Sequence, residues 1–381
     1  MTGRGAVTAY GVGFSEFVAG VETRRGALTE FGARANTRVS EPTRPNWKAG
    51  LVTDLSAFRR TFPEIKPPLP ASVTQMVMLA AHEALASAGI DTSEAPKPIG
   101  MFFNRNRGPA AVVAKAMLPV LQGGAKKMSP LWFSQAVANA PIGALSVAMG
   151  LRGPHVLSMG GGALQMAFDE LSSERSSVVL CGALEEVEPY SFRAALENGF
   201  IGQAEADSSE AVASFGEGAV CFVLESLASA RARGAQPLAE LVAVEQGLDE
   251  EVREDCQLRG FGQVSAAGLE RLCRAAMQAA QVRAKDLTFF VGGQNGQPAL
   301  REAQRGALHA LGRPDLAERD PSLSFLVGDG YGMAALLSVA WALHELNGAT
   351  KLPPPAPAYA LLTHTEFHGQ HSAVVMRGVS L

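Results

Sequence analysis

The sequence is poor in cysteine, in aromatic side chains and in charge. Its 381 residues include four cysteines, 7% aromatic residues and 18% charged residues. The cysteines form no Cys-x-x-Cys pair and no histidine stands at metal-ligand spacing from them, so we interpret them as small buried hydrophobic residues in a reducing compartment. They are Cys181, Cys221, Cys256 and Cys273. We therefore predict no metal site and no cofactor.

Long apolar runs and basic clusters are lacking too. The N-terminus has no basic segment followed by an apolar run, which predicts no signal peptide. The longest apolar stretch, 333–346, is interrupted by His344 and Glu345, so we expect a buried helix there and no membrane span. A net charge of −4 without a basic cluster argues against a nucleic-acid partner. These features predict a cytoplasmic protein with no membrane or nucleic-acid partner.

What the chain does contain is small and apolar. Hydrophobic residues make up 47% of it and glycine occurs 40 times, a composition that suits close packing of helices on sheets. Apolar strands alternate with helical patterns along the whole length, which predicts an α/β fold. The length suits two domains or a duplicated one, and we place the boundary between residues 1–235 and 236–381. No repeat is visible in the sequence itself.

The expected elements follow from apolar periodicity. Strands are expected at 6–12, 98–103, 177–182, 219–225, 238–244, 287–291, 322–327, 359–362 and 373–376. Helices are expected from Ser15, at 74–88, 110–121, 133–150 with a kink at Pro141, 267–280, 299–311 and 333–346.

The segment 151–165 reads as a short apolar strand, a glycine turn and a new helix. This is the pattern of a nucleophile elbow, in which a strained turn presents one reactive side chain. Here the turn is Gly160, Gly161 and Gly162, which presents none. Ser158 precedes the turn, and a buried core hydroxyl is a better interpretation of it than a substitute nucleophile because no base is identifiable. The pattern predicts a partner or regulatory subunit.

Several strings together resemble the β-ketoacyl synthase family of the thiolase fold. They are Val7–Gly13, Ala49–Asp54, Ala80–Ile90, Gly150–Pro154 and Phe215–Glu225, the last being the most recognisable. The resemblance covers nearly the whole chain. It implies duplicated α/β halves in a five-layer αβαβα arrangement.

The resemblance also implies which positions have lost the family's catalytic groups. The nucleophilic cysteine falls at Gly162 when counted from Pro154, or at Gly160 when the following helix is matched. The first histidine motif is similar to Val291–Gly296, which puts Gln294 in its place. The second is similar to Gly328–Ala334, which puts Asp329 there, and the motif's lysine falls near Ser324. Condensation needs a thiolate and groups that stabilise an enolate, so independent activity is not expected.

Three further polar features have plain structural interpretations. Asp329 stands at an expected helix start, where it suits an N-cap. Glu217 in Gly-Glu-Gly is better read as a buried, hydrogen-bonded carboxylate than as an acid catalyst. His364, His368 and His371 have ligand spacing only on a helix, and the resemblance places them in a loop.

The resemblance implies a chain length factor, a ketosynthase-like subunit without the nucleophile. Such a subunit pairs with an active ketosynthase in type II polyketide, polyene or fatty-acid-like biosynthesis, meets the acyl carrier protein through that complex and limits acyl chain length. The expected gate of the acyl tunnel comprises Val112, Val113, Ala116, Met117, Phe102, Phe103 and Phe133. The alternatives are a structural partner without a tunnel role, an acyltransferase or decarboxylase with an altered site, and a homodimeric pseudoenzyme.

Overall fold

The computed structural model describes most of the chain. The described residues are 1–30, 48–67, 69–92, 97–198, 200–201, 212–249, 262–349, 358–366 and 368–379. Among them, no helix combines the length and the apolar character needed to cross a membrane. Cys256 and the part of the sequence around it lie outside these residues.

Two twisted sheets form the frame of the molecule. The larger has the order β2 (Gly11–Val12), β1 (Gly3–Thr8), β8 (Gly218–Glu225), β7 (Val178–Glu185), β5 (Gly100–Asn104) and β6 (His155–Ser158). The smaller has the order β10 (Leu287–Val291), β11 (Tyr359–Thr365), β12 (Gln370–Gly378) and β9 (Ala239–Leu248). A short pair, β3 (Thr29–Glu30) and β4 (Lys48–Ala49), stands apart.

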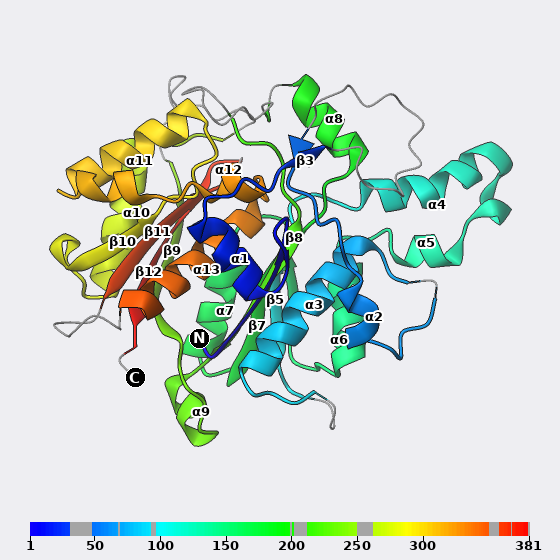
Figure 1. Ribbon diagram of the computed structural model, residues 1–381, viewed down its shortest axis with the longest axis horizontal. Helices are drawn as coiled ribbons and strands as arrows, with labels where there is room; N and C mark the ends of the chain where they lie inside the picture. Colours follow the sequence, from blue (N-terminus) through cyan, green and yellow to red (C-terminus); the bar gives the residue numbers. More distant parts are fainter. Residues whose placement is uncertain are drawn as a thin grey trace.

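The helices complete five layers, as Figure 1 shows. Two helices lie between the sheets: α7 (Ala163–Ser172), which packs on β5, β7 and β9, and α13 (Gly332–Ala349), which packs on strands of both sheets. One outer layer contains α3 (Ser72–Ser87) and α6 (Ala140–Met149), and the other contains α10 (Ala266–Ala279) and α11 (Pro298–Ala310). The predicted αβαβα arrangement is confirmed.

The core follows these layers. Strand β7 is buried almost throughout, as expected for a strand covered by helices on both faces. Helix α3 lies so close to β1 that a β-carbon at Gly3 or Gly5 would overlap the carbonyl oxygen of Ala84 or Ala80. Strands of the larger sheet all precede residue 235 and those of the smaller sheet all follow it, while the division into two duplicated halves stays a prediction.

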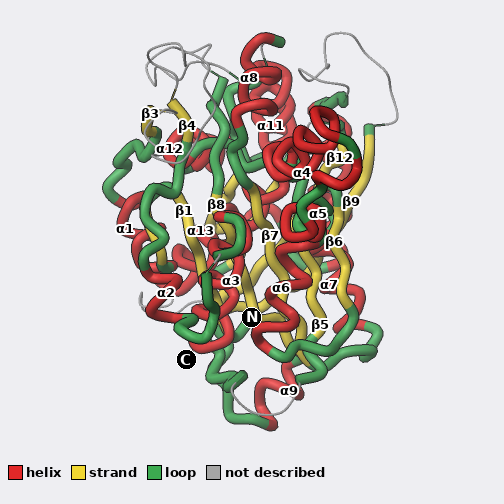
Figure 2. The backbone as a smooth tube through the Cα atoms, turned by 90° about the vertical axis from the view of Figure 1, so that its right-hand side faces the viewer, coloured by secondary structure: helices red, strands yellow, loops and turns green. Residues whose placement is uncertain are grey.

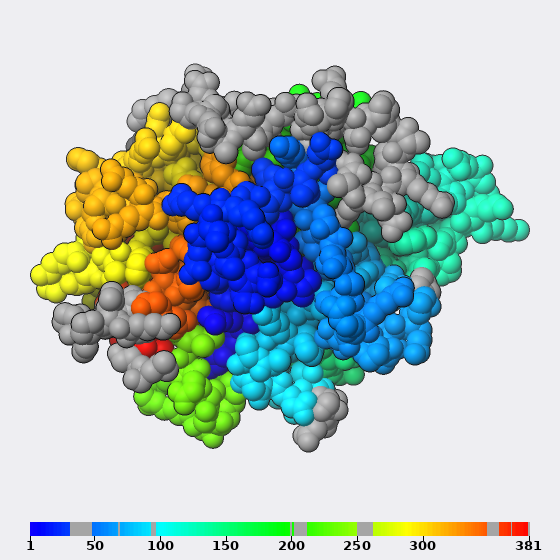
Figure 3. All heavy atoms as spheres, viewed as in Figure 1, coloured from blue at the N-terminus to red at the C-terminus, as the bar shows by residue number. Residues whose placement is uncertain are grey.

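Seven further α-helices lie within the described residues. They are α1 (Phe14–Glu22), α2 (Ala57–Thr61), α4 (Ala110–Gly123), α5 (Pro130–Ser134), α8 (Pro189–Glu197), α9 (Leu227–Ala232) and α12 (Leu323–Val327). Helices α4 and α5 pack on each other and extend beyond the body of the molecule, on the right of Figures 1 and 3. We call residues 110–134 the excursion.

Three expected elements were wrong. The single strand expected at 6–12 is two strands, β1 and β2, which pair antiparallel across a turn. The single kinked helix at 133–150 is two helices, α5 and α6, and Pro141 sits in the first turn of α6, where its missing N–H costs nothing. The expected strand at 322–327 is the short helix α12. A short apolar run does not reveal by itself whether it is a strand or a buried helical turn.

Candidate functional site

The predicted elbow is present at the centre of the molecule. Strand β6 ends at Ser158, the glycine turn follows, and α7 begins at Ala163. Gly160 has φ of +147°, a conformation that a side chain at this position would strain. The side-chain Oδ1 of Asn104, at the end of β5, accepts the N–H of Ala163 at 2.8 Å, and the side-chain amide of Gln246 in β9 donates to the backbone carbonyl of Gly161 at 2.9 Å. Side chains from both sheets therefore hold the turn.

A glutamate fills the space beside the turn. A β-carbon added to Gly161 would lie 2.8 Å from Oε1 of Glu366 and 3.4 Å from its Cγ. Glu366 is buried, and its Oε2 accepts a hydrogen bond from Nδ2 of Asn106 at 2.8 Å. The Oδ1 of the same Asn106 accepts the N–H of Gly332, at the start of α13, at 3.2 Å. The carboxylate thus stands in the room that a side chain at Gly161 would need.

His364 completes this buried group. Its Nε2 lies 3.3 Å from Oε1 of Glu366. Burial lowers the pKa of His364, but the carboxylate of Glu366 and the charge of Asp329 outweigh that effect, so its pKa is raised above the ordinary value. The pair is a buried acid–imidazole contact, which the sequence comparison did not anticipate.

Asp329 belongs to the same region but does not cap α13, which begins at Gly332. Its carboxylate accepts the N–H of Tyr331 at 2.8 Å and Nδ2 of Asn295 at 3.0 Å. The amide of Gln294, the residue expected in place of the first histidine, donates to Gln304 of α11. Asn295, one residue further along the loop, is the residue that contacts Asp329. Ser324 is buried within α12.

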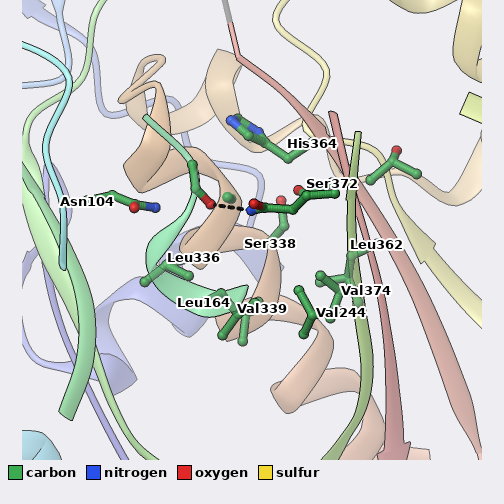
Figure 4. Close-up of a pocket in the computed structure, with 14 residues that line it drawn as sticks. Asn104, Leu164, Val244, Leu336, Ser338, Val339, Leu362, His364, Ser372 and Val374 are labelled. Atoms are coloured by element: carbon green, nitrogen blue, oxygen red, sulfur yellow. Dashed lines mark hydrogen bonds between the residues drawn. The ribbon is translucent and has the colours of Figure 1, made fainter. Parts of the chain in front are cut away.

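The spaces around this group are small. A cavity of about 10 Å³ lies between α7, α13 and the smaller sheet, as Figure 4 shows. Its apolar wall is made by Leu164, Val244, Leu336, Val339, Leu362 and Val374, and Asn104, His364 and Ser372 supply its polar side. A second cavity of about 10 Å³ adjoins His364 and Asp329. Each holds about one water molecule, so neither of these two cavities accommodates an acyl chain.

A second set of buried charges lies beneath the excursion. Nε of Arg107 is 3.3 Å from Glu185, and its guanidinium stacks 4.4 Å from the ring centre of Phe215. Oε1 of Glu188 accepts the N–H of Ala111, in the first turn of α4, at 3.0 Å. Burial raises the pKa of Glu188 to about 7. These contacts fix the segment that leads from β5 into α4.

The predicted gate residues divide into two groups. Val112 and Ala116 lie on the buried side of α4. Val113 and Met117 of the same helix are each 38% exposed, and Phe133 is 58% exposed. Phe102 and Phe103 are both buried, but they belong to core clusters on opposite faces of the larger sheet. At most one of these two phenylalanines therefore lines any one tunnel.

The other polar candidates have structural contacts. Glu217 is buried and accepts the N–H groups of Val52 and Val187 at 2.8 and 3.0 Å, as predicted for a structural carboxylate. Ser158 is half-buried at the sheet edge and not in the core. His364 and His371 lie in the paired strands β11 and β12, not in a loop, and Nε2 of His371 is 3.3 Å from Asp249.

The described cysteines are unsuited to replace the missing nucleophile. Cys181, Cys221 and Cys273 are buried and unpaired by disulfides. Burial raises the pKa of Cys181 and of Cys273 to about 12, so their thiols stay protonated. This confirms their interpretation as small buried hydrophobic residues.

The layers and the central strand–turn–helix define the class: this is a thiolase-fold protein. The family model described as "Beta-ketoacyl synthase, N-terminal domain" matches residues 1–230. The chain belongs to the β-ketoacyl synthase family.

Its relatives are distant. Nodulation protein E of Rhizobium sp. (strain N33) is 25% identical over 63% of this chain and 62% of its own length. The 3-oxoacyl-[acyl-carrier-protein] synthase 2 of Staphylococcus aureus is 28% identical over 44% of this chain and 46% of its own length. The matched stretches thus span less than two thirds of these relatives.

Solved structures match over the full length. A chain of AntDE:AntF, a type II PKS acyl-carrier protein in complex with its ketosynthase, has a TM-score of 0.77 at 18% identity and covers 99% of this chain and 98% of its own. The ishigamide ketosynthase/chain length factor has a TM-score of 0.76 at 22% identity, and the match covers 100% of this chain and 99% of that structure's chain. At such identities these likenesses establish the fold.

Proposed function

We propose that this protein is a non-catalytic, ketosynthase-like subunit of the chain-length-factor type. It pairs with an active ketosynthase that condenses malonyl units on an acyl carrier protein, and it helps to limit the length of the acyl chain. The observation that carries the proposal is a turn made of Gly160, Gly161 and Gly162, which presents no nucleophile, with the carboxylate of Glu366 filling the space beside Gly161. A side chain at Gly161 has no room while that carboxylate is in place.

The remaining site residues support the same proposal. We propose that the negative charge of Glu366, beside Gly161, and of Asp329, which also acts on His364, opposes the formation of an enolate. The two cavities that adjoin His364 are each about the size of one water molecule, too small for an acyl chain. We propose Gly160, Gly161, Gly162, Ser324 and Asp329 as the vestigial site, with Asn295 in the place first expected for Gln294.

A subunit of this kind needs a surface for its partner, and the larger sheet offers one. Among the residues that the structure describes, strand β6 is the last strand of that sheet and pairs on one side only, with β5. Edge strands of this kind are ready sites for another chain to pair. The excursion lies beside this edge (Figure 2), so the exposed side of α4, with Val113 and Met117, is our proposed contribution to a gate shared with the partner.

Co-purification tests the proposal first. The tagged protein is recovered from its native host and the bound chains are identified by mass spectrometry. The expected result is a stoichiometric thiolase-fold protein that carries a cysteine at the elbow and two histidines. A homodimer with no such partner would overturn the proposal.

The closed site also favours a second candidate, a partner that stabilises the ketosynthase and takes no part in measuring the chain. Product length separates the two candidates, because only a gate changes it. Enlarged residues on α4 in a complex that still assembles provide that measurement.

A further inference from the structure

The surface beside β6 is unusually apolar. We call the surface formed by β6, α6 and the excursion the α6 face; Figure 2 looks onto it. The exposed residues of α6 include Gly143, Ala144, Val147 and Ala148, none of which is polar, and Val147 is 76% exposed. Met159, just after β6, is 58% exposed. A helix that is apolar on its exposed side as well requires a covering partner.

The excursion continues this apolar surface away from the body. Large hydrophobic residues exposed along it are Val113, Met117, Leu118, Leu121, Leu131 and Phe133. Between α6 and β6 lies a groove of about 360 Å³, lined by Ile142, Gly143, Leu157 and Met159 among others. Because the excursion extends beyond the layers, its exposed side contacts nothing else in the described part of this chain.

The charged residues of this face are all basic. The chain has 37 acidic residues, yet residues 97–168, all of them described, include no aspartate and no glutamate. The basic residues of that stretch are Lys97, Arg105, Arg107, Lys115, Lys126, Lys127 and Arg152. Arg105 and Arg107 are buried near Glu185 and Glu188, whereas Lys115, Lys126, Lys127 and Arg152 are exposed.

We propose that the α6 face selects its partner by charge. It fits a second thiolase-fold chain whose matching face is apolar and edged by carboxylates, and it disfavours a second copy of this chain. The inference rests on the proposed function, because it specifies the chemistry of the partner proposed there.

Symmetry supplies the argument against a second copy. A twofold homodimer buries the same patch of both subunits, so this face would meet itself. Its lysines and Arg152 would then enter the interface without a carboxylate from residues 97–168 of either chain. Like charges in one interface oppose association, whereas opposite charges speed the encounter and exclude wrong partners. A partner that is only a polyanion, with no apolar surface, is also disfavoured, because it would leave the side chains of Val147 and Met159 exposed to water.

Charge reversal on this protein tests the inference without knowledge of the native partner. The variant Lys126→Glu/Lys127→Glu/Arg152→Glu serves as a probe that keeps the apolar surface and presents carboxylates. Sedimentation analysis compares wild type alone, the variant alone, and their equimolar mixture. The matched control reverses three exposed basic residues on the opposite side of the molecule, Lys285→Glu/Arg305→Glu/Arg319→Glu.

The expected result is a mixture that associates on the order of tenfold more tightly than either chain alone at low ionic strength. Salt at about 0.5 M screens the charges and removes the difference. The control variant mixed with wild type gives no gain. Wild-type self-association that equals the mixture, or that is insensitive to salt, would overturn the inference.

These outcomes stand apart from those of the proposed function. Recovery of a ketosynthase with no effect of charge reversal refutes only the charge selection. Charge-dependent association of the purified chains, with no thiolase-fold partner in the host, refutes the proposed function alone.

Discussion

Gly161 and Glu366 share one small space: a β-carbon on Gly161 would lie 2.8 Å from Oε1 of Glu366. The two residues come from opposite sheets, since Gly161 follows β6 and Glu366 follows β11. The glycine is required because the carboxylate is there, and the carboxylate has room because the glycine has no side chain. This relationship explains why the middle residue of the turn is a glycine.

We expect Gly161→Ala to lower the free energy of unfolding by about 1–3 kcal/mol, because the added methyl group displaces a buried, hydrogen-bonded carboxylate. In a Glu366→Ala background the same change costs less than about 0.5 kcal/mol. Urea denaturation of the four proteins gives the coupling. Gly143→Ala, in α6 with open space around its α-carbon, is the control and should be neutral or slightly stabilising. If the losses of unfolding free energy from Gly161→Ala and Glu366→Ala simply add in the double variant, the two residues do not share this space.

Glu188 makes stability depend on pH. Its folded-state pKa of about 7 lies above the ordinary value of 4.5, so ionisation costs the folded state, and stability falls as the pH rises from about 4.5 to 7. We expect Glu188→Gln to exceed wild type by about 2 kcal/mol at pH 8 and to match it near pH 4.5. Denaturation midpoints across this range measure the effect. Glu197→Gln, exposed on α8, is the control, and equal pH slopes for wild type and Glu188→Gln would refute the prediction.

Enlarging the exposed side of α4 tests the proposed gate. In the assembled complex with its ketosynthase, we expect Val113→Trp to shorten the main product by at least one two-carbon unit, because a larger side chain stops the chain earlier. Leu121→Trp, near the end of the same helix, should leave product length unchanged. Ala116→Trp is less informative because Ala116 is fully buried and a larger residue displaces the helix. Mass spectrometry of the products gives the answer, and unchanged length for Val113→Trp favours the purely structural partner.

The described thiols should be inert in the native protein. Burial and raised pKa values keep Cys181, Cys221 and Cys273 protonated and out of reach. With iodoacetamide at pH 8, peptide mapping should find these three cysteines unmodified until denaturant is added. Rapid native labelling of Cys181 would show that β7 is more accessible than its packing implies.

Local sequence determined much of this fold. Apolar strands alternating with amphipathic helices, and the strand–glycine–helix pattern at 151–165, depend on neighbouring residues and their periodicity, so they were predictable. The break at Asn139 and the helical turn at 323–327 were missed because short apolar runs and an early proline fit more than one local structure. Glu217 was recognisable because it stands in a string typical of the family.

Tertiary structure decided which side chains meet at the centre. Nothing near Gly161 in the sequence indicates that Glu366 fills its space, since the contact arises only when the two sheets pack on α7 and α13. The direction of Gln294 toward α11, and of Asn295 toward Asp329, likewise depends on packing of the loop after β10. The acid-free stretch 97–168 is plain in the sequence, but only the fold places its lysines and its apolar residues together on one exposed face, because burial is a property of the packed chain.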